Sequence, residues 1–537
     1  MVRTQVKRRG LLAVASMTLS AVMAAAGCSD DAADQSAEGD GIVSVSKGQP
    51  AEPAVDPATV PRPDGPTLGA VKLYVAIYEQ PDPRAKKLGY LRLGAKVPRG
   101  EKPVKFDACG GGYYRVLPKG YVCLDDGASI DDDHPILKAD LKGPDRTKPL
   151  PYTYGFVRAI APRYYRLPTT KEQFKYEMSL KRHLRSFRRL KDKWNSYELG
   201  SNDIPIDRTG RVLDDPPEQP PELSYGERFG GNGEDLVPWF FDGGRKIPNV
   251  STFKVPDYAV ITNRVKRHAG LSLIDAFQGD ERHFALTTDL RLVPTSKLKP
   301  GRGSLFHGVE IGKLWELPVA FVKQKKVHRY DREGGRWKRR SRLAWGTPIQ
   351  LTGEVSKNGK YRMVETDDLD WLRTRDLAIV VKTNDLPKFA QGSTKWIDVS
   401  IQRQTLTLFE GATPVYATMV STGRDGLGDP SKTHSTPRGT FRVQKKHVTD
   451  TMDSDVLGSR FELQDVPWVQ YFKAGYALHA AYWHTDYGRP RSHGCINMSP
   501  VDAYRAFWWT DPPMPQRWHG VTAGESMGEG TRIHVHP

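Results

Sequence analysis

The chain has 537 residues, more than one hydrophobic core usually organises, so several domains are expected. Hydrophobic residues make up 38% and charged residues 27%, the composition of a soluble globular protein with a polar bias. The net charge of +17 favours an anionic partner, and the export signal described next argues against nucleic acid as that partner.

The N-terminal residues indicate an export signal. Lys7-Arg8-Arg9 precedes an apolar run, Leu11 to Ala26, that is too short for a comfortable membrane span. The run ends in Ala24-Ala25-Ala26-Gly27-Cys28, and small residues before a cysteine resemble a bacterial lipobox. This resemblance implies a lipoprotein signal peptide over residues 1–27 and an acylated Cys28. The alternative is ordinary signal-peptidase cleavage near Ala26, which would leave Cys28 free.

The signal predicts where the protein resides. We expect an exported, periplasmic protein that its lipid holds on a membrane, since several acyl chains anchor a protein stably. Ser29 rather than Asp after Cys28 favours the outer membrane, by resemblance to sorting in some bacteria. The positive charge then suits the cell wall or lipid headgroups, and no nucleic-acid partner is expected.

The next segments predict a tether and a small β domain. Residues 28–66 are rich in Asp, Ala, Gly and Pro and cannot bury enough apolar surface to fold, so we expect a disordered tether. Residues 67–130 contain short alternating runs separated by Gly and Pro, a pattern that resembles a bacterial SH3-like domain. Such a unit would bind wall peptides or serve only as a spacer.

Cys109 and Cys123 flank two predicted strands of that β domain. A turn between the strands could bring the two thiols together, and an exported protein permits a disulfide. We therefore predict a Cys109–Cys123 disulfide, with two buried free thiols as the alternative.

Two further regions precede the C-terminal part. Residues 151–310 are expected to mix one long helix with strands and to contain a possible SH3-like unit. Thr169 and Glu172 predict the capping box that begins the helix, and its basic face is taken as solvated. Residues 311–385 are predicted to form a further SH3-like domain. The predicted fold class is mainly β with α+β parts, in a multidomain chain.

The stretch with the clearest chemistry is Leu478 to Asn497. Cys495 follows Gly494, which allows a sharp turn, and His479 and His484 lie upstream. A thiol with a pKa of ~8.5 needs a base to become a good nucleophile at neutral pH. Ser499, Pro500 and Asp502 predict the start of a helix just beyond the cysteine.

Ser492-His493-Gly494-Cys495-Ile496-Asn497 with an upstream histidine resembles the catalytic motif of the YkuD-type L,D-transpeptidases, cysteine enzymes of peptidoglycan. Ser421-Thr422-Gly423 and Thr436-Pro437-Arg438-Gly439-Thr440-Phe441 resemble two further segments of that family, in the expected order. The resemblance implies a β-rich catalytic domain over residues 395–537, with peptidoglycan stem peptides as partners. The gap between His479 and Ser492 is a little shorter than is usual in the family.

The resemblance also implies a mechanism. Cys495 would attack a stem-peptide carbonyl, His479 would act as base, and the acyl group would pass to an amine or to water. His493, Gly494 and Ser492 would form the turn and the oxyanion hole, and Tyr471, Tyr482 and Trp483 would wall the peptide groove. No cofactor or metal is expected.

Three alternatives stay open from the residues alone. His484 competes with His479 as the base. A zinc site made by His479, His484, His493 and Cys495 has suitable ligand types but none of the usual spacings. A wall-binding or scaffolding lipoprotein with an inactive catalytic fold is the other reading of the whole chain. The oligomeric state and the acceptor are not predicted.

Overall fold

The computed structural model describes residues 56–195, 223–251, 253–383, 385–454 and 461–537. The predicted signal segment 1–27, Cys28 and residues 28–55 of the predicted tether lie outside the described residues. No helix in the described ranges is both long and apolar enough to cross a membrane.

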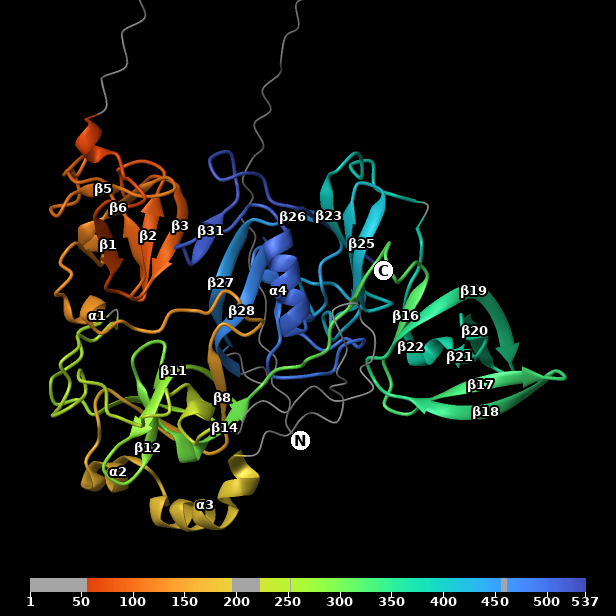
Figure 1. The fold of residues 1–537 in the computed structure, drawn as a ribbon, viewed down its shortest axis with the longest axis horizontal. Helices are drawn as coiled ribbons and strands as arrows, with labels where there is room; N and C mark the ends of the chain where they lie inside the picture. Colours follow the sequence, from red (N-terminus) through yellow and green to blue (C-terminus); the bar gives the residue numbers. More distant parts are fainter. Residues whose placement is uncertain (1–55, 196–222, 252, 384, 455–460) are drawn as a thin grey trace, which may run out of the picture. The chain divides into compact units, whose positions relative to one another are not determined.

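The fold is mainly β with a few helices, which confirms the predicted class (Figure 1). Within the described ranges the strands form four sheets, of 3, 16, 6 and 7 strands. No closed barrel is found in the part of the chain that the structure describes. The resemblance of residues 67–130 and 311–385 to SH3-like domains therefore stays a prediction.

Residues 67–130 divide their strands between two sheets. The strands are β1 (Thr67–Ala70), β2 (Tyr74–Tyr78), β3 (Lys87–Arg92), β4 (Lys96–Pro98), β5 (Tyr113–Arg115), β6 (Tyr121–Cys123) and β7 (Ala128–Ser129). The short helix α1 (Pro135–Lys138) follows. A disulfide joins Cys109 to Cys123, at the end of β6.

The region 151–310 contributes strands to the sheet that includes β28. They are β8 (Thr153–Val157), β9 (Ala161–Tyr164), β10 (Ile261–Val265), β11 (Gly270–Gln278), β12 (His283–Thr287), β13 (Leu292–Pro294) and β14 (Leu298–Gly301). The short strand β15 (Val309–Glu310) pairs instead with β25.

The predicted single long helix of this region is two helices. Thr169 and Glu172 form the expected capping box, but it begins the short helix α2 (Thr170–Tyr176). The chain then leaves the helical conformation at Glu177, and Ser179 has a φ of 54°. The second helix, α3, spans Leu180–Asn195. A left-handed residue interrupts the backbone hydrogen-bond ladder, which a side-chain pattern alone does not reveal.

Residues 311–385 form a sheet of their own from β16 (Val319–Val322), β17 (Val327–Glu333), β18 (Arg336–Leu343), β19 (Pro348–Asn358), β20 (Tyr361–Thr366), β21 (Trp371–Arg373) and β22 (Leu377–Val380).

The C-terminal region contains β23 (Lys395–Ser400), β24 (Thr405–Glu410), β25 (Thr413–Met419), β26 (Gly439–Arg442), β27 (Lys445–Ser454), β28 (Phe461–Lys473), β29 (Tyr476–Ala480), β30 (Ile496–Met498), β31 (Gly520–Thr522) and β32 (Arg532–His536). Helix α4 (Pro500–Trp509) begins where the sequence predicts, because Ser499 accepts a hydrogen bond from the backbone N–H of Asp502. At its other end the buried Lys446 ammonium donates to the carbonyl oxygens of Phe507, Thr510 and Pro512.

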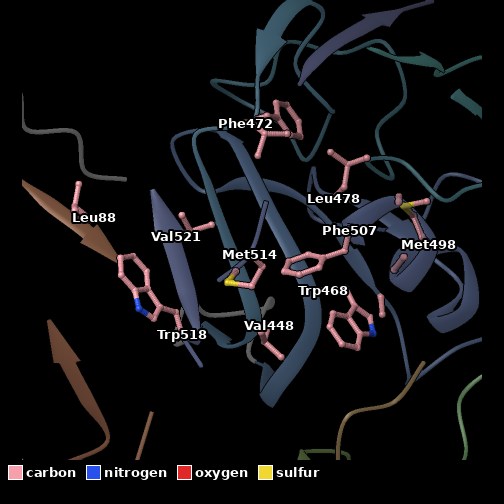
Figure 2. Packing of buried hydrophobic residues seen from close by; sticks show 14 of the residues in the cluster. Leu88, Val448, Trp468, Phe472, Leu478, Met498, Phe507, Met514, Trp518 and Val521 are labelled. Carbon is pink, nitrogen blue, oxygen red and sulfur yellow. The ribbon is translucent and has the colours of Figure 1, made fainter. Parts of the chain in front are cut away.

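Pairing links regions that the sequence predicts as separate domains. β31 pairs with β3, and β11 pairs with β28 in parallel. One hydrophobic cluster contains Leu88 of β3 together with Trp468 and Phe507 of the C-terminal region, and Figure 2 shows part of it. These shared contacts fix the C-terminal strands that carry the candidate site.

Candidate active site

The two strands β29 and β30 bring His479 and Cys495 to one place. They pair in parallel, with His479 opposite Asn497 and Leu478 opposite Ile496. Cys495 directly precedes β30, so by the two-residue period of a strand its side chain projects from the same face as that of Asn497. Asn497 is the register partner of His479, so all three side chains share that face. The sheet register therefore places the thiol and the imidazole on the same side.

The turn before Cys495 depends on glycine. Gly494 has a φ of 119°, and a Cβ there would lie 2.5 Å from the Tyr476 ring. Its N–H donates to Ser492 Oγ at 3.1 Å, and the Ser492 hydroxyl donates to the carbonyl oxygen of Cys495. Ser492 thus holds the turn from both sides.

The other two motif segments support this turn directly. Thr436 Oγ1 donates to the carbonyl oxygen of Gly494 at 2.8 Å and accepts from the Gly423 N–H at 2.9 Å. Ser421 exchanges backbone hydrogen bonds with Asn497 at 2.9 and 2.8 Å. Segments far apart in sequence therefore build one hydrogen-bonded frame around Cys495.

His479 carries a neutral imidazole in this arrangement. Its Nδ1 lies 3.1 Å from the carbonyl oxygen of Ala480. A carbonyl can only accept, so Nδ1 carries the proton and Nε2 keeps its lone pair. Burial lowers the pKa of His479 to about 4, so the ring is uncharged at neutral pH.

His484 is held differently. Its Nδ1 accepts from the backbone N–H of Asp486 at 3.3 Å, so the neutral ring carries its proton on Nε2. That nitrogen lies 3.0 Å from the side-chain amide of Asn497. With the amide oxygen facing Nε2, the buried Oδ1 of Asn497 gains a partner that it otherwise lacks. Both ring nitrogens are then engaged, which leaves His484 no lone pair for a thiol proton.

The thiol itself is partly exposed and protonated at rest. Cys495 Sγ lies 3.7 Å from the Gly475 carbonyl oxygen. Burial raises the pKa of Cys495 to about 11, and the backbone N–H of Ala477 opposes that shift. The Cys495 thiol and the His479 imidazole are therefore both uncharged at rest.

A cavity of about 740 Å³ opens beside the pair. Six of the predicted site residues line it: Cys495, His479, Ser492, His493, Tyr482 and Trp483. The ring of Trp483 lies 5.7 Å from that of His479. Tyr482 is only 2% exposed, and its ring stacks on Tyr154 at 4.1 Å, so it is mostly a packing residue.

Tyr471 is not among the lining residues of that cavity. Its hydroxyl donates to Asp450 at 2.9 Å, and the same carboxylate oxygen lies 2.8 Å from His447 Nδ1. This side chain anchors β28 to β27.

Sequence reasoning missed the second wall of the cavity. Phe156, His268, Lys299 and Arg302 line it from the region 151–310. They lie far from the cysteine in sequence, and no motif marks them; only the pairing of β8, β11 and β14 brings them there.

The zinc alternative finds no support in the geometry. No three ligand atoms from His479, His484, His493 and Cys495 lie within 4.8 Å of one another. Tetrahedral zinc ligands lie closer together than that, at about 2.0–2.3 Å from the metal.

With this geometry in hand, comparison with known proteins identifies the C-terminal region. Residues 394–535 match the YkuD family, the L,D-transpeptidase catalytic domain. This part of the chain is a YkuD L,D-transpeptidase catalytic domain, which confirms the predicted family. No curated protein matches the chain significantly.

Several solved structures are similar to the same part. An L,D-transpeptidase from Xylanimonas cellulosilytica is 26% identical, covers 29% of this chain and has a TM-score of 0.20. An L,D-transpeptidase from Stackebrandtia nassauensis is 21% identical, covers 29% of this chain and has a TM-score of 0.19. The chain spans 65% and 62% of these two structures. The catalytic domain of the Enterococcus faecium L,D-transpeptidase is 21% identical, covers 27% of this chain and 98% of its own, and has a TM-score of 0.21.

Proposed function

We propose that the protein is an exported peptidoglycan L,D-transpeptidase with Cys495 as nucleophile and His479 as base. The observation that carries the proposal is the hydrogen bond from His479 Nδ1 to the carbonyl oxygen of Ala480, which leaves Nε2 with its lone pair on a residue that lines the same cavity as Cys495. The family match of residues 394–535 supports the reaction class.

The chemistry has two halves. Cys495 Sγ attacks the amide carbonyl between a diamino acid and a D-alanine of a donor stem peptide. His479 Nε2 takes the thiol proton and gives it to the leaving amine of D-alanine, so a C–S bond replaces the C–N bond. An amine from a second stem peptide, or water, then attacks the thioester carbonyl and breaks the C–S bond, and the proton that this nucleophile loses passes through His479 Nε2 to the sulfur.

The neutral resting pair sets when the thiolate forms. Because the pKa of Cys495 is raised to about 11 and that of His479 lowered to about 4, proton transfer is unfavourable in the empty site. Transfer coupled to attack on the carbonyl avoids a free thiolate, and the oxyanion then needs stabilisation. Gly494 already donates its N–H to Ser492, so we assign the oxyanion to the backbone N–H groups of His493 and Cys495.

The anchor belongs to the same proposal. Acylation of Cys28 would hold the protein on a membrane, with the outer membrane favoured, and the part of the predicted tether that precedes Asp56 would let the enzyme reach the wall. The rest of the predicted tether, residues 56–66, is folded, since Lys102 N–H donates to the carbonyl oxygen of Ala58 and Arg99 N–H to that of Pro66. The net charge is +17 for the whole chain and +13 without the four cations of the predicted signal segment, and this excess suits an anionic wall or lipid surface.

Incubation of the full-length protein with a carbapenem, an acylating inhibitor of the resembled family, tests the nucleophile. Intact-mass analysis should show one added drug mass on the wild type, mapped to Cys495, and none on Cys495→Ala. A stem tetrapeptide should release D-alanine with the wild type only. If the wild type forms no adduct and releases no D-alanine, while wall binding survives in Cys495→Ala, the scaffolding alternative replaces the enzyme.

A further inference from the structure

The sheet that β16 to β22 form has apolar side chains on both of its faces. Neighbouring residues along a strand project from opposite faces. Met363 and Trp371 belong to one hydrophobic cluster, together with Tyr330, while the residues that follow them, Val364 and Leu372, belong to another. The second cluster also contains residues of β16 and β22, so other strands of the same region cover that face. The face of Met363 and Trp371 is covered differently.

Arginine side chains lie over the rings of this face. Arg373 lies between two tyrosine rings, with its Cζ 5.0 Å from the centroid of Tyr330 and 4.1 Å from that of Tyr361. Arg332 lies over the ring of Trp337 at 5.6 Å. A guanidinium that stacks on a ring keeps its N–H donors in its own plane. The rings therefore hold these guanidinium groups without using their hydrogen-bond donors.

The strand register adds a third arginine to the same face. Arg339 of β18 lies opposite Tyr330 of β17, and Trp371 of β21 lies opposite Tyr330 on the other side. Residues directly opposite in antiparallel strands project from the same face of a sheet. This surface, which carries Arg332, Arg339 and Arg373, is the arginine face.

Cations outnumber carboxylates in this region. Residues 311–385 contain 17 Lys and Arg against 10 Asp and Glu. Asp331 of the β17–β18 hairpin pairs with Arg340. Glu365 lies on the arginine face by register and accepts a hydrogen bond from Thr352 Oγ1 at 3.0 Å. The region therefore keeps an excess of positive charge after its internal pairs are formed.

The three arginines of the face keep most of their donors. Among the residues that the structure describes, Arg332, Arg339 and Arg373 take part in no ion pair. Arg332 donates one hydrogen bond, to Ser356 Oγ at 3.3 Å, and the buried Nε of Arg373 donates none. The Asp376 carboxylate interacts with Arg373 only at a distance, without an ion pair. Since a guanidinium has five N–H donors, each arginine can still bind an anion.

The arginine face offers no side chain that could enter a bilayer. The exposed large apolar residues of the described part of 311–385 are Leu314, Val355 and Leu369. Leu314 and Leu369 lie outside the strands, and Val355 lies opposite Val364, on the other face. Membrane-surface proteins insert apolar side chains beside their cations. The arginine face therefore suits a solvated polymer with anionic groups better than a membrane.

The sheet that carries the arginine face is fixed to a segment that borders the cavity. Arg489 donates a hydrogen bond to Gln324, which lies between β16 and β17. A Cβ at Gly488 would lie 2.7 Å from that of Lys323. Residues 483–485, just before this contact, line the cavity. A polymer bound at the arginine face is thereby attached to the part of the molecule that carries the cavity.

We propose that the arginine face binds carboxylates of peptidoglycan stem peptides and so holds the protein on the wall independently of Cys495. The inference rests on the proposed function for the identity of the polymer, and it assigns the binding to a region outside the YkuD match. A planar carboxylate fits the guanidinium fork with two parallel hydrogen bonds. Peptidoglycan repeats its carboxylates in every stem peptide, so several arginines on one face can be engaged at once.

The test measures binding of the full-length Cys495→Ala protein to purified peptidoglycan sacculi by sedimentation. This parent variant cannot be trapped as an acyl-enzyme. Charge-assisted hydrogen bonds change affinity by about tenfold or more, so Arg332→Gln with Arg339→Gln and Arg373→Gln should bind at least about tenfold more weakly than the parent. Sacculi whose carboxylates have been converted to amides should bind the parent with a similar loss.

A matched control removes the same number of charges elsewhere. Lys119→Gln with Lys246→Gln and Arg517→Gln removes three exposed cations outside the arginine face and should bind as the parent does. Arg339→Gln alone changes an exposed side chain and should weaken binding in the same direction by a smaller factor. Thermal unfolding of each variant shows that it is folded.

The outcomes separate this inference from the proposed function. Equal binding of sacculi by the parent and the triple arginine variant, or an equal loss in the control, would overturn the role of the arginine face and leave the enzyme untouched. If the triple variant instead loses affinity only for phosphatidylglycerol vesicles, the surface docks on a membrane and the proposal is wrong. With Cys495 restored, the triple variant should release D-alanine from a soluble tetrapeptide at the wild-type rate, because the arginine face lies outside the cavity. If the wild type releases no D-alanine while the arginines still govern sacculus binding, the proposed function fails and this inference stands.

Discussion

Arg92 of β3 and Asp465 of β28 form an ion pair at 2.9 Å, with side chains 6% and 0% exposed. The Asp465 carboxylate also accepts from the hydroxyls of Ser272, Thr288 and Thr449. One carboxylate therefore joins the region 67–130, the region 151–310 and the catalytic domain.

This relationship predicts a large effect on stability. Asp465→Asn leaves the Arg92 charge buried without its counter-ion, which should lower the free energy of unfolding by about 3–5 kcal/mol. Urea unfolding followed by tryptophan fluorescence measures the change. Glu101→Gln breaks the exposed pair with Arg62 and is the control, with no measurable effect expected. Equal midpoints for the two variants would show that the buried pair contributes nothing.

The hydrogen bonds of the two histidines predict different defects. His479→Gln should slow acylation of Cys495 by about 10²–10⁴-fold, the usual contribution of a general base. His484→Gln should lower the melting temperature, because Asn497 loses its partner, and should leave acylation within about tenfold of the wild type. Stopped-flow carbapenem acylation and thermal unfolding give both readouts. If His484→Gln alone abolishes acylation, the assignment of the base is wrong.

The neutral resting pair predicts a steep pH dependence of thiol reactivity. The thiolate is the reactive form, and the pKa of Cys495 is raised to about 11. Between pH 7 and pH 10 the rate of Cys495 alkylation by iodoacetamide should therefore rise about tenfold per pH unit. A short peptide with one free cysteine is the control, and its rate should level off above pH ~8.5. A plateau of the protein's rate below pH 8 would reveal a preformed thiolate beside a protonated His479.

The turn before Cys495 predicts a contrast between two glycines near its sulfur, Gly494 and Gly475. Gly494→Ala places a Cβ against the Tyr476 ring at a positive φ, so Cys495 must shift. A shift of about 1 Å at a reacting atom costs about 10²-fold in rate, which is the loss of acylation that we expect. Gly475→Ala meets no atom within 4 Å and keeps the carbonyl near Sγ, so it should retain the wild-type rate. The ratio of the two acylation rates is the measurement, and a ratio near one would contradict the role of the turn.

Short-range sequence patterns were enough to predict several local features around Cys495. The cysteine, the glycine before it and the helix start at Ser499 are local signals, because a turn and a cap each depend on a few neighbouring residues. The motif order also predicted the catalytic family of residues 394–535. The prediction of a single long helix was wrong, because the chain breaks at Ser179 through a backbone conformation that hydrophobic spacing does not encode.

Only the tertiary structure shows that the two histidines differ in their hydrogen bonds, and only it supplies the second wall of the cavity. The state of His479 depends on the carbonyl of Ala480 in the folded strand, and that of His484 depends on Asn497, which strand pairing brings near. Lys299 reaches the cavity because β14 pairs with β8 in one register, and a shift of one residue would turn it to the other face. Register is set by contacts between distant segments, so no stretch of sequence carries it alone.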